Sequence, residues 1–147
     1  PFGVSVSISA CPWNSENMLA IFGFRTEEIS YEDSDKPSNL VFLIDVSGSM
    51  QSDDKLPLLK KAFSNLVSAL GENDVVSIVT YSGKEAVVLD GCAGNRDEAI
   101  MDAINTLRAS GSTNGEAGIV KAYEIAEANF KADGNNRIII ASDGDLT

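Results

Sequence analysis

The sequence contains no histidine and only two cysteines, Cys11 and Cys92. The lack of histidine excludes Ser-His-Asp and Cys-His catalysis, the HExxH helix of metalloproteases and most zinc sites. Two cysteines are too few for a thiolate metal cluster and allow one disulfide at most, so they do not indicate a redox compartment. Catalysis by this chain would therefore need carboxylates.

Positive charge is also scarce, since 11 Lys and Arg stand against 22 Asp and Glu and leave a formal net charge of −11. Such a charge repels a phosphate backbone and an anionic membrane surface, which argues against nucleic acid as a partner. No apolar run approaches the roughly 18 residues of a membrane span, so we expect no direct membrane insertion. The 147 residues, 44% of them hydrophobic, are typical of one folded domain.

Two parts with different patterns follow each other along the chain. Residues 4–10 alternate apolar residues with serine, as a half-buried strand does, and residues 18–29 predict a second strand. A polar, charged stretch that contains Pro37 then interrupts the strand pattern. The sequence therefore predicts an N-terminal β extension with its linker over 1–38, and a separate domain over 39–147.

The second part alternates apolar strands with amphipathic helices. Continuous apolar runs predict strands buried on both faces, and apolar residues at helical spacing predict three helices. The predicted elements are a strand (40–44), a helix (56–70), a hairpin (75–81 and 86–89), two helices (about 96–107 and 116–130) and a strand (137–141). This order predicts an α/β fold, a doubly wound and mostly parallel sheet with helices on both faces.

The last predicted strand, 137–141, is apolar enough to need a neighbour on each side, yet the sequence reaches only Thr147. A bare sheet edge is a template for pairing with another chain. We therefore expect this chain to self-associate or to be completed by a further segment.

Oxygen-bearing side chains are concentrated in three loops of the second part, at the ends of predicted elements. The candidate ligands are Asp45, Ser47, Ser49, Thr113 and Asp143. The first three are spaced by two residues, and we expect their loop to need Gly48 for a close backbone approach. Because ligands of open α/β sheets bind at the carboxyl ends of strands, we expect these oxygens to converge. Such a set suits Mg²⁺ or Mn²⁺, with Ca²⁺ a further candidate, and leaves a position open for water or a partner's carboxylate.

Each loop also has a purely structural interpretation. Asp45 and Ser47 could cap the next helix, Thr113 could cap the third helix, and Asp143 with Gly144 could form an ordinary turn. The presence of all three loops in order favours the metal site over this alternative.

The three loops together resemble the metal-ion-dependent adhesion site of von Willebrand factor type A (vWA) domains. Residues 43–50 contain the DxSxS signature, 111–114 match the threonine loop and 142–144 match the aspartate loop. The resemblance covers residues 39–147 and implies a Rossmann-like fold. Because the family ordinarily has six core strands, it also implies that the last strands of the fold are missing from this sequence.

The resemblance implies a role for each candidate ligand. Ser47, Ser49 and Thr113 would contact Mg²⁺ directly, Asp45 and Asp143 often through water, and an acidic residue of a partner would complete the octahedron. The function implied is a non-enzymatic, Mg²⁺-dependent protein-interaction or adhesion module. The N-terminal extension is similar to that of bacterial surface or lipoprotein-type vWA proteins, which implies an extracytoplasmic location.

Two other functions are compatible with the same loops. Haloacid dehalogenase-like phosphoryl-transfer enzymes also keep a nucleophilic Asp at the end of the first strand, where this chain has Asp45. Those enzymes carry a second Asp two residues later, where this chain has Ser47. The third alternative is a scaffold whose metal site is vestigial.

Overall fold

The computed structural model describes residues 3–25, 36–111 and 115–144. The chain divides into two compact units, Pro1–Asp35 and Lys36–Thr147, which are described separately. No helix in the described part of the chain is long and apolar enough to cross a membrane.

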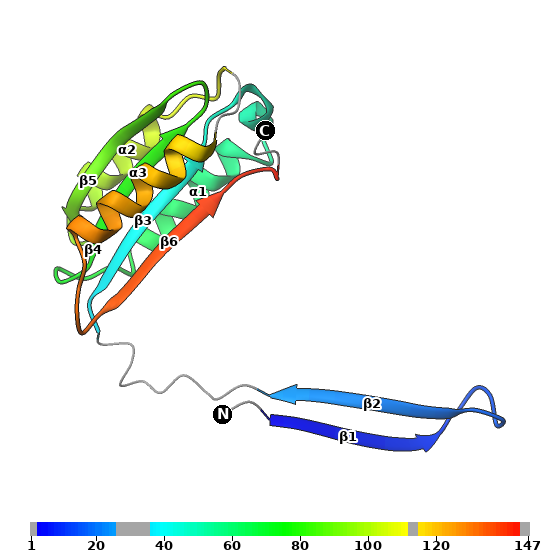
Figure 1. The fold of residues 1–147 in the computed structure, drawn as a ribbon. Helices are drawn as coiled ribbons and strands as arrows, with labels where there is room; N and C mark the ends of the chain where they lie inside the picture. Colours follow the sequence, from blue (N-terminus) through cyan, green and yellow to red (C-terminus); the bar gives the residue numbers. More distant parts are fainter. Residues whose placement is uncertain (1–2, 26–35, 112–114, 145–147) are drawn as a thin grey trace. The chain divides into compact units, whose positions relative to one another are not determined.

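The first unit is an antiparallel hairpin of β1 (Gly3–Ala10) and β2 (Met18–Arg25), drawn in blue in Figure 1. The serine alternation gives this hairpin two different faces, because successive side chains of a strand point to opposite sides. On one face Val4 lies opposite Phe24 and Val6 lies opposite Phe22. These four side chains are all exposed among the described residues, so the hairpin carries an apolar face.

The second unit contains a four-stranded sheet in the order β5-β4-β3-β6. Its strands are β3 (Ser38–Asp45), β4 (Val75–Tyr81), β5 (Glu85–Ala93) and β6 (Asn135–Ala141). Strand β3 pairs in parallel with both β4 and β6, whereas β5 pairs antiparallel with β4. The predicted mostly parallel sheet and its hairpin are confirmed.

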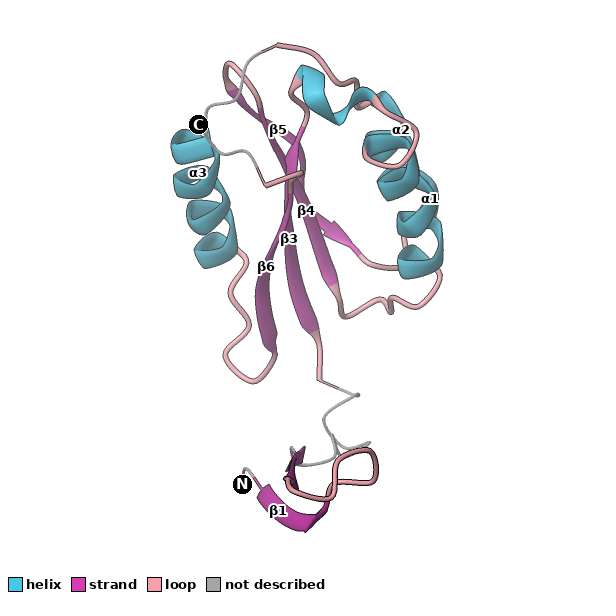
Figure 2. Cartoon of the chain, turned by 90° about the vertical axis from the view of Figure 1, so that its right-hand side faces the viewer, coloured by secondary structure: helices cyan, strands magenta, loops and turns pink. Residues whose placement is uncertain are grey.

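Helices cover both faces of this sheet, as Figure 2 shows. They are the 3₁₀ helix η2 (Gly48–Gln51), α1 (Leu56–Val67), α2 (Asp97–Thr106) and α3 (Gly115–Ala128). Helices α1 and α2 lie on one face and α3 lies on the other. The predicted α/β fold class is therefore confirmed.

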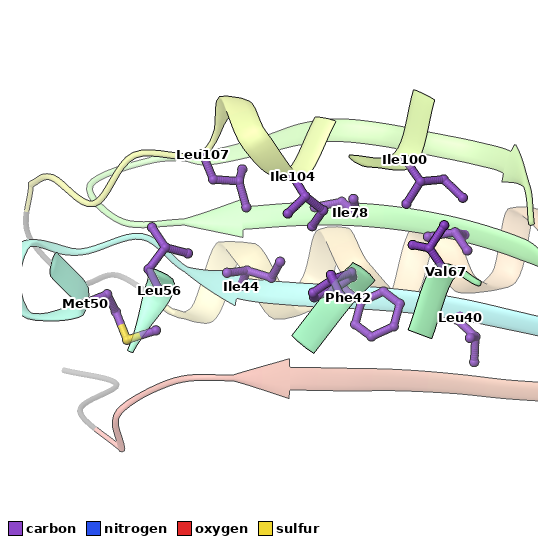
Figure 3. Packing of buried hydrophobic residues seen from close by; sticks show 12 residues of the cluster. Leu40, Phe42, Ile44, Met50, Leu56, Val67, Ile78, Ile100, Ile104 and Leu107 are labelled. Atoms are coloured by element: carbon purple, nitrogen blue, oxygen red, sulfur yellow. The ribbon is translucent and has the colours of Figure 1, made fainter. Parts of the chain in front are cut away.

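Two apolar clusters fill the space between the sheet and the helices. On the α1 and α2 face, Phe42 and Ile44 of β3 pack in one cluster with Ile100 of α2, as seen in Figure 3. Phe63 of α1 belongs to the same cluster. On the α3 face, the alternate β3 residues pack with Ala122 and Ile125 of α3. Strand β3 is therefore buried on both faces, and its carboxyl end is fixed in position.

The element ends differ slightly from the predicted ones. Helix α1 ends at Val67 rather than at Leu70, because the amide of Leu70 already bonds the carbonyl of Val67 in a tighter turn. Strand β5 continues to Ala93, past Gly91, whose φ of 59° is readily adopted only by glycine. Asp90 and Gly91 interrupt the apolar pattern of this strand, so its last residues could not be predicted from the sequence.

Strand β6 lies at the edge of the sheet and pairs with β3 alone among the described strands. Its side chains Ile139 and Ile140, which point to opposite faces, are 39% and 51% exposed. The described part of this strand therefore presents apolar surface and free backbone groups.

Candidate metal centre

The first loop begins where β3 ends, at Asp45, which is fully buried. Its Oδ1 atom accepts a hydrogen bond from the backbone amide of Ser47 at 2.8 Å. Its Oδ2 atom is buried and has no hydrogen-bond partner among the described residues. The hydroxyl oxygens of Ser47 and Ser49 lie 3.0 Å apart. Three of the five predicted ligands therefore stand together on this loop.

The first loop is held in shape by the turn that follows it. The amide of Met50 bonds the carbonyl of Ser47 at 3.0 Å, and the Met50 side chain is buried in the core, as Figure 3 shows. The expected need for Gly48 is wrong, because Gly48 has no positive φ and a Cβ there would meet Gly111 at an ordinary 3.6 Å. Core anchoring of Met50, rather than glycine freedom, fixes this loop.

The second loop is joined to the first by two backbone hydrogen bonds. The amide of Ser110 bonds the carbonyl of Val46 at 2.6 Å, and the amide of Gly48 bonds the carbonyl of Gly111 at 3.1 Å. Thr113 lies outside the described residues, so its place among the ligands stays a prediction.

The third loop follows β6 and carries Asp143, whose side chain is 12% exposed. The Oδ2 atom of Asp143 accepts a hydrogen bond from the ammonium of Lys55 at 2.7 Å. The same ammonium donates to the carbonyl of Ser49 at 3.0 Å, so it joins the third loop to the first. The hydrogen bond to Asp143, supported by the charges of Asp143, Asp54 and Asp45, raises the pKa of Lys55. Lys55 was not predicted as part of the site, because no local pattern relates it to a residue 88 positions away.

Tyr81 is a second residue of this region that was not predicted from the sequence. It ends β4, directly opposite Asp45 in the sheet register, and it is fully buried. Its phenol oxygen has no hydrogen-bond partner among the described residues. Burial is the main cause that raises the pKa of Tyr81; Ser142 opposes it as the next largest effect, and the carboxylates of Asp45 and Asp143 add smaller increases. The phenol is therefore neutral and does not compensate the charge of the Asp45 carboxylate.

The helix-cap alternative does not fit the first loop. Ser47 precedes η2 but its side chain makes no capping hydrogen bond, and α1 is preceded by Lys55, which makes none either. A buried carboxylate oxygen without a partner costs free energy unless a cation or donor faces it. The first loop therefore does not cap a helix, and the buried Oδ2 atom of Asp45 is left without a partner among the described residues.

The donor set fits a hard divalent cation. It consists of two carboxylates and the hydroxyls of the first loop, which are the ligand types that Mg²⁺ and Mn²⁺ prefer. The described residues contain no group of three or more Cys, Asp or Glu side chains that could hold a metal ion. Hydroxyl oxygens would therefore have to supply part of the coordination.

The von Willebrand factor type A domain profile matches residues 40–145 of the chain. The uncharacterized protein YfbK of Escherichia coli K12 is 41% identical over 146 residues, which are 99% of this chain and 25% of YfbK. The chain thus spans about a quarter of that relative. Among solved structures, the three N-terminal domains of the type V pili tip protein Mfa5 of Porphyromonas gingivalis share 18% identity at a TM-score of 0.62, over 95% of this chain and 25% of that one. The PilB minor pilin of Streptococcus sanguinis shares 15% identity at a TM-score of 0.64, over 97% of this chain and 46% of that one.

Proposed function

Because the chain belongs to the von Willebrand factor type A family, we propose that its second unit is a Mg²⁺-dependent module that binds a carboxylate of a partner protein. The observation that carries this proposal is the Oδ2 atom of Asp45, a buried carboxylate oxygen with no partner among the described residues. A divalent cation would satisfy that oxygen and would remove the cost of burying an unpaired charge.

The residues around Asp45 have separate parts in this function. Ser47 and Ser49 offer two hydroxyl oxygens 3.0 Å apart, which can bind one ion together. Asp143 supplies a second carboxylate from the neighbouring strand end, and Thr113 is expected to add a third hydroxyl. The bound ion would supply an exchangeable position for an incoming carboxylate. A partner's carboxylate would bind by direct coordination at this open position, because the acidic surface of the chain otherwise repels it.

The proposed function also concerns where in the cell the chain acts. Mfa5 and PilB are proteins of bacterial pili, and YfbK is bacterial. We place the chain outside the cytoplasm of a bacterium, at the cell surface or on a lipoprotein anchor, where an adhesion module meets its partners.

Calorimetric titration with Mg²⁺ and Mn²⁺ tests the metal centre. We expect saturable binding by the unchanged chain and none by Asp45→Asn, which keeps the shape of the side chain and removes its charge. The matched control is Asp102→Asn, which removes an exposed carboxylate from α2. Equal binding by the Asp45→Asn variant, or no saturable heat from the unchanged chain, would contradict the proposal and favour a vestigial scaffold.

Partner binding needs a test of its own. A glutamate-containing peptide immobilised on a surface should retain the chain in Mg²⁺ and release it in a chelator. The same peptide with glutamine in place of glutamate is the control, because it lacks the carboxylate that would reach the ion.

The phosphoryl-transfer alternative gives a different result. It requires hydrolysis of an aryl phosphate in the presence of Mg²⁺, lost in Asp45→Asn. Ser47 stands where that chemistry needs a second carboxylate, so we expect no turnover above the uncatalysed rate.

A further inference from the structure

Lys55 is placed where a cation would be expected at the candidate metal centre. It is the residue before α1, and its side chain is 33% exposed. Its ammonium contacts the Asp143 carboxylate at 2.7 Å and the Ser49 carbonyl at 3.0 Å. Both contacts are oxygens of loops that carry predicted ligands.

The charge around this ammonium is strongly negative. The carboxylates of Asp143, Asp54 and Asp45 all act on Lys55 electrostatically, in a chain with a formal net charge of −11. Without a positive group at this end of the sheet, Asp45 and Asp143 would repel each other across the two loops. The ammonium pairs directly with Asp143, whereas Asp45 makes no contact with it and acts on it only over a longer distance.

We propose that Lys55 is an internal counter-ion of the candidate metal centre, which holds Asp143 against the first loop in the metal-free protein and which a divalent cation displaces. This inference rests on the proposed function, because it assumes that the centre binds such a cation. It makes Lys55 a regulator of metal affinity: the ammonium stabilises the metal-free state and lowers the affinity for Mg²⁺ by competing for Asp143.

A second possible role for Lys55 predicts the opposite change in Mg²⁺ affinity when the lysine is removed. If the ammonium only oriented Asp143 as a ligand, removing it would loosen the third loop and weaken Mg²⁺ binding. If it competes with the ion, removing it strengthens Mg²⁺ binding and destabilises the metal-free protein. The direction of the change in affinity therefore decides between the two roles.

The experiment compares Lys55→Met with Lys61→Met by calorimetric titration with Mg²⁺. Lys61 is an exposed lysine of α1, so its substitution makes the same change in net charge away from the site. We expect Lys55→Met to bind Mg²⁺ about tenfold more tightly than Lys61→Met, and to unfold at a lower temperature in a chelator. Lys55→Gln, which is neutral but polar, is the second variant and should behave in the same way.

The outcomes separate this inference from the proposed function. Saturable binding by the unchanged chain, with equal or weaker binding by Lys55→Met, overturns the inference and leaves the function standing. No saturable binding by any variant overturns both. In a chelator, Lys55→Met and Asp143→Asn should be non-additive in the free energy of unfolding, because each removes the same ion pair. Additive effects would show that no such pair stabilises the metal-free protein, and would also overturn the inference.

Discussion

Asp45 and Ser47 share one hydrogen bond, from the Ser47 amide to Asp45 Oδ1 at 2.8 Å, and this leaves the second carboxylate oxygen of Asp45 buried without a partner among the described residues. The Oδ1 atom therefore stabilises the loop, while the Oδ2 atom is buried from solvent and makes no hydrogen bond to a described residue. Such an arrangement costs stability in the metal-free protein. An unpaired buried carboxylate oxygen is more typical of a binding site than of a hydrophobic core.

The first prediction concerns the stability of Asp45→Asn without metal. The amide oxygen can still accept from the Ser47 amide, and no buried negative charge is left unpaired. We expect the variant to gain about 1 kcal/mol in the free energy of unfolding in a chelator. Urea denaturation followed by circular dichroism measures this gain. A loss of stability would mean that the Asp45 carboxylate is already compensated in the metal-free chain.

The second prediction concerns the two hydroxyls of the first loop. Ser47→Ala and Ser49→Ala each remove one oxygen from the pair that lies 3.0 Å apart, so each should weaken Mg²⁺ binding about tenfold, or 1.4 kcal/mol. Titration calorimetry measures the loss. Ser64→Ala is the control, because its hydroxyl only bonds the carbonyl of Lys61 within α1. Unchanged affinity in both loop variants would remove these serines from the ligand set.

The third prediction concerns the pH dependence that Tyr81 confers. Burial raises the pKa of Tyr81 above its ordinary value of 10.0. As the pH rises above that value, the unfolded chain releases this proton while the folded chain retains it, so stability falls with pH until the folded pKa is passed. The difference in phenolate absorbance between the unchanged chain and Tyr81→Phe gives the titration of this one residue. We expect its midpoint above 10, and a midpoint at or below 10 would contradict the prediction.

The sequence was sufficient to predict the sheet and its helices because burial on both faces leaves a clear pattern. The apolar run at 40–44 and the isoleucine run at 137–141 became β3 and β6, and the helical spacing gave α1, α2 and α3. These signals are local, since each strand or helix carries its own periodicity. The α/β order then followed from their sequence along the chain.

The surroundings of the site could be predicted only in part. The positions of Asp45 and Asp143 at strand ends follow from the run of apolar residues before each. The contact of Lys55 with Asp143 and the place of Tyr81 opposite Asp45 depend on strand register and loop path, which no single segment encodes. Tyr81 also belongs to an apolar run that predicts a strand, so the pattern gave no indication that its hydroxyl lies near the site.

The fourth prediction concerns the approach of α3 to the sheet. A Cβ atom at Gly118 would lie 2.8 Å from the Tyr81 Cβ and 3.2 Å from the Leu43 side chain. Gly118→Ala should therefore destabilise the chain by about 1–3 kcal/mol, although alanine favours a helix more than glycine does. Because the displaced strand residue is Tyr81, we also expect weaker Mg²⁺ binding.

Chemical denaturation measures the stability of this variant. The same exchange at the exposed Glu127, compared as Glu127→Gly and Glu127→Ala, gives the intrinsic preference of α3 for alanine. If Gly118→Ala stabilises the chain by as much as alanine does relative to glycine at position 127, the prediction of a steric clash between α3 and Tyr81 is wrong.

The fifth prediction concerns association through β6. No strand of the described residues pairs with its outer edge, and Ile139 and Ile140 present apolar surface on opposite faces. Two copies of the chain could pair these edges antiparallel about a two-fold axis, which is how bare edges commonly associate. We expect light scattering coupled to size exclusion to show a species larger than the monomer. Ile140→Lys should shift it toward the monomer, because a charged side chain on an edge strand opposes such pairing.

The hairpin is the competing source of association, since its exposed face also carries large apolar side chains such as Phe22 and Phe24. Phe22→Lys is therefore the matched variant: it places the same charge on the other apolar surface. If β6 is the interface, Phe22→Lys stays associated while Ile140→Lys dissociates, and the reverse result would assign the interface to the hairpin. A monomer in the unchanged chain at every concentration would show that neither surface pairs. In that case the open edge of β6 does not drive self-association in this chain.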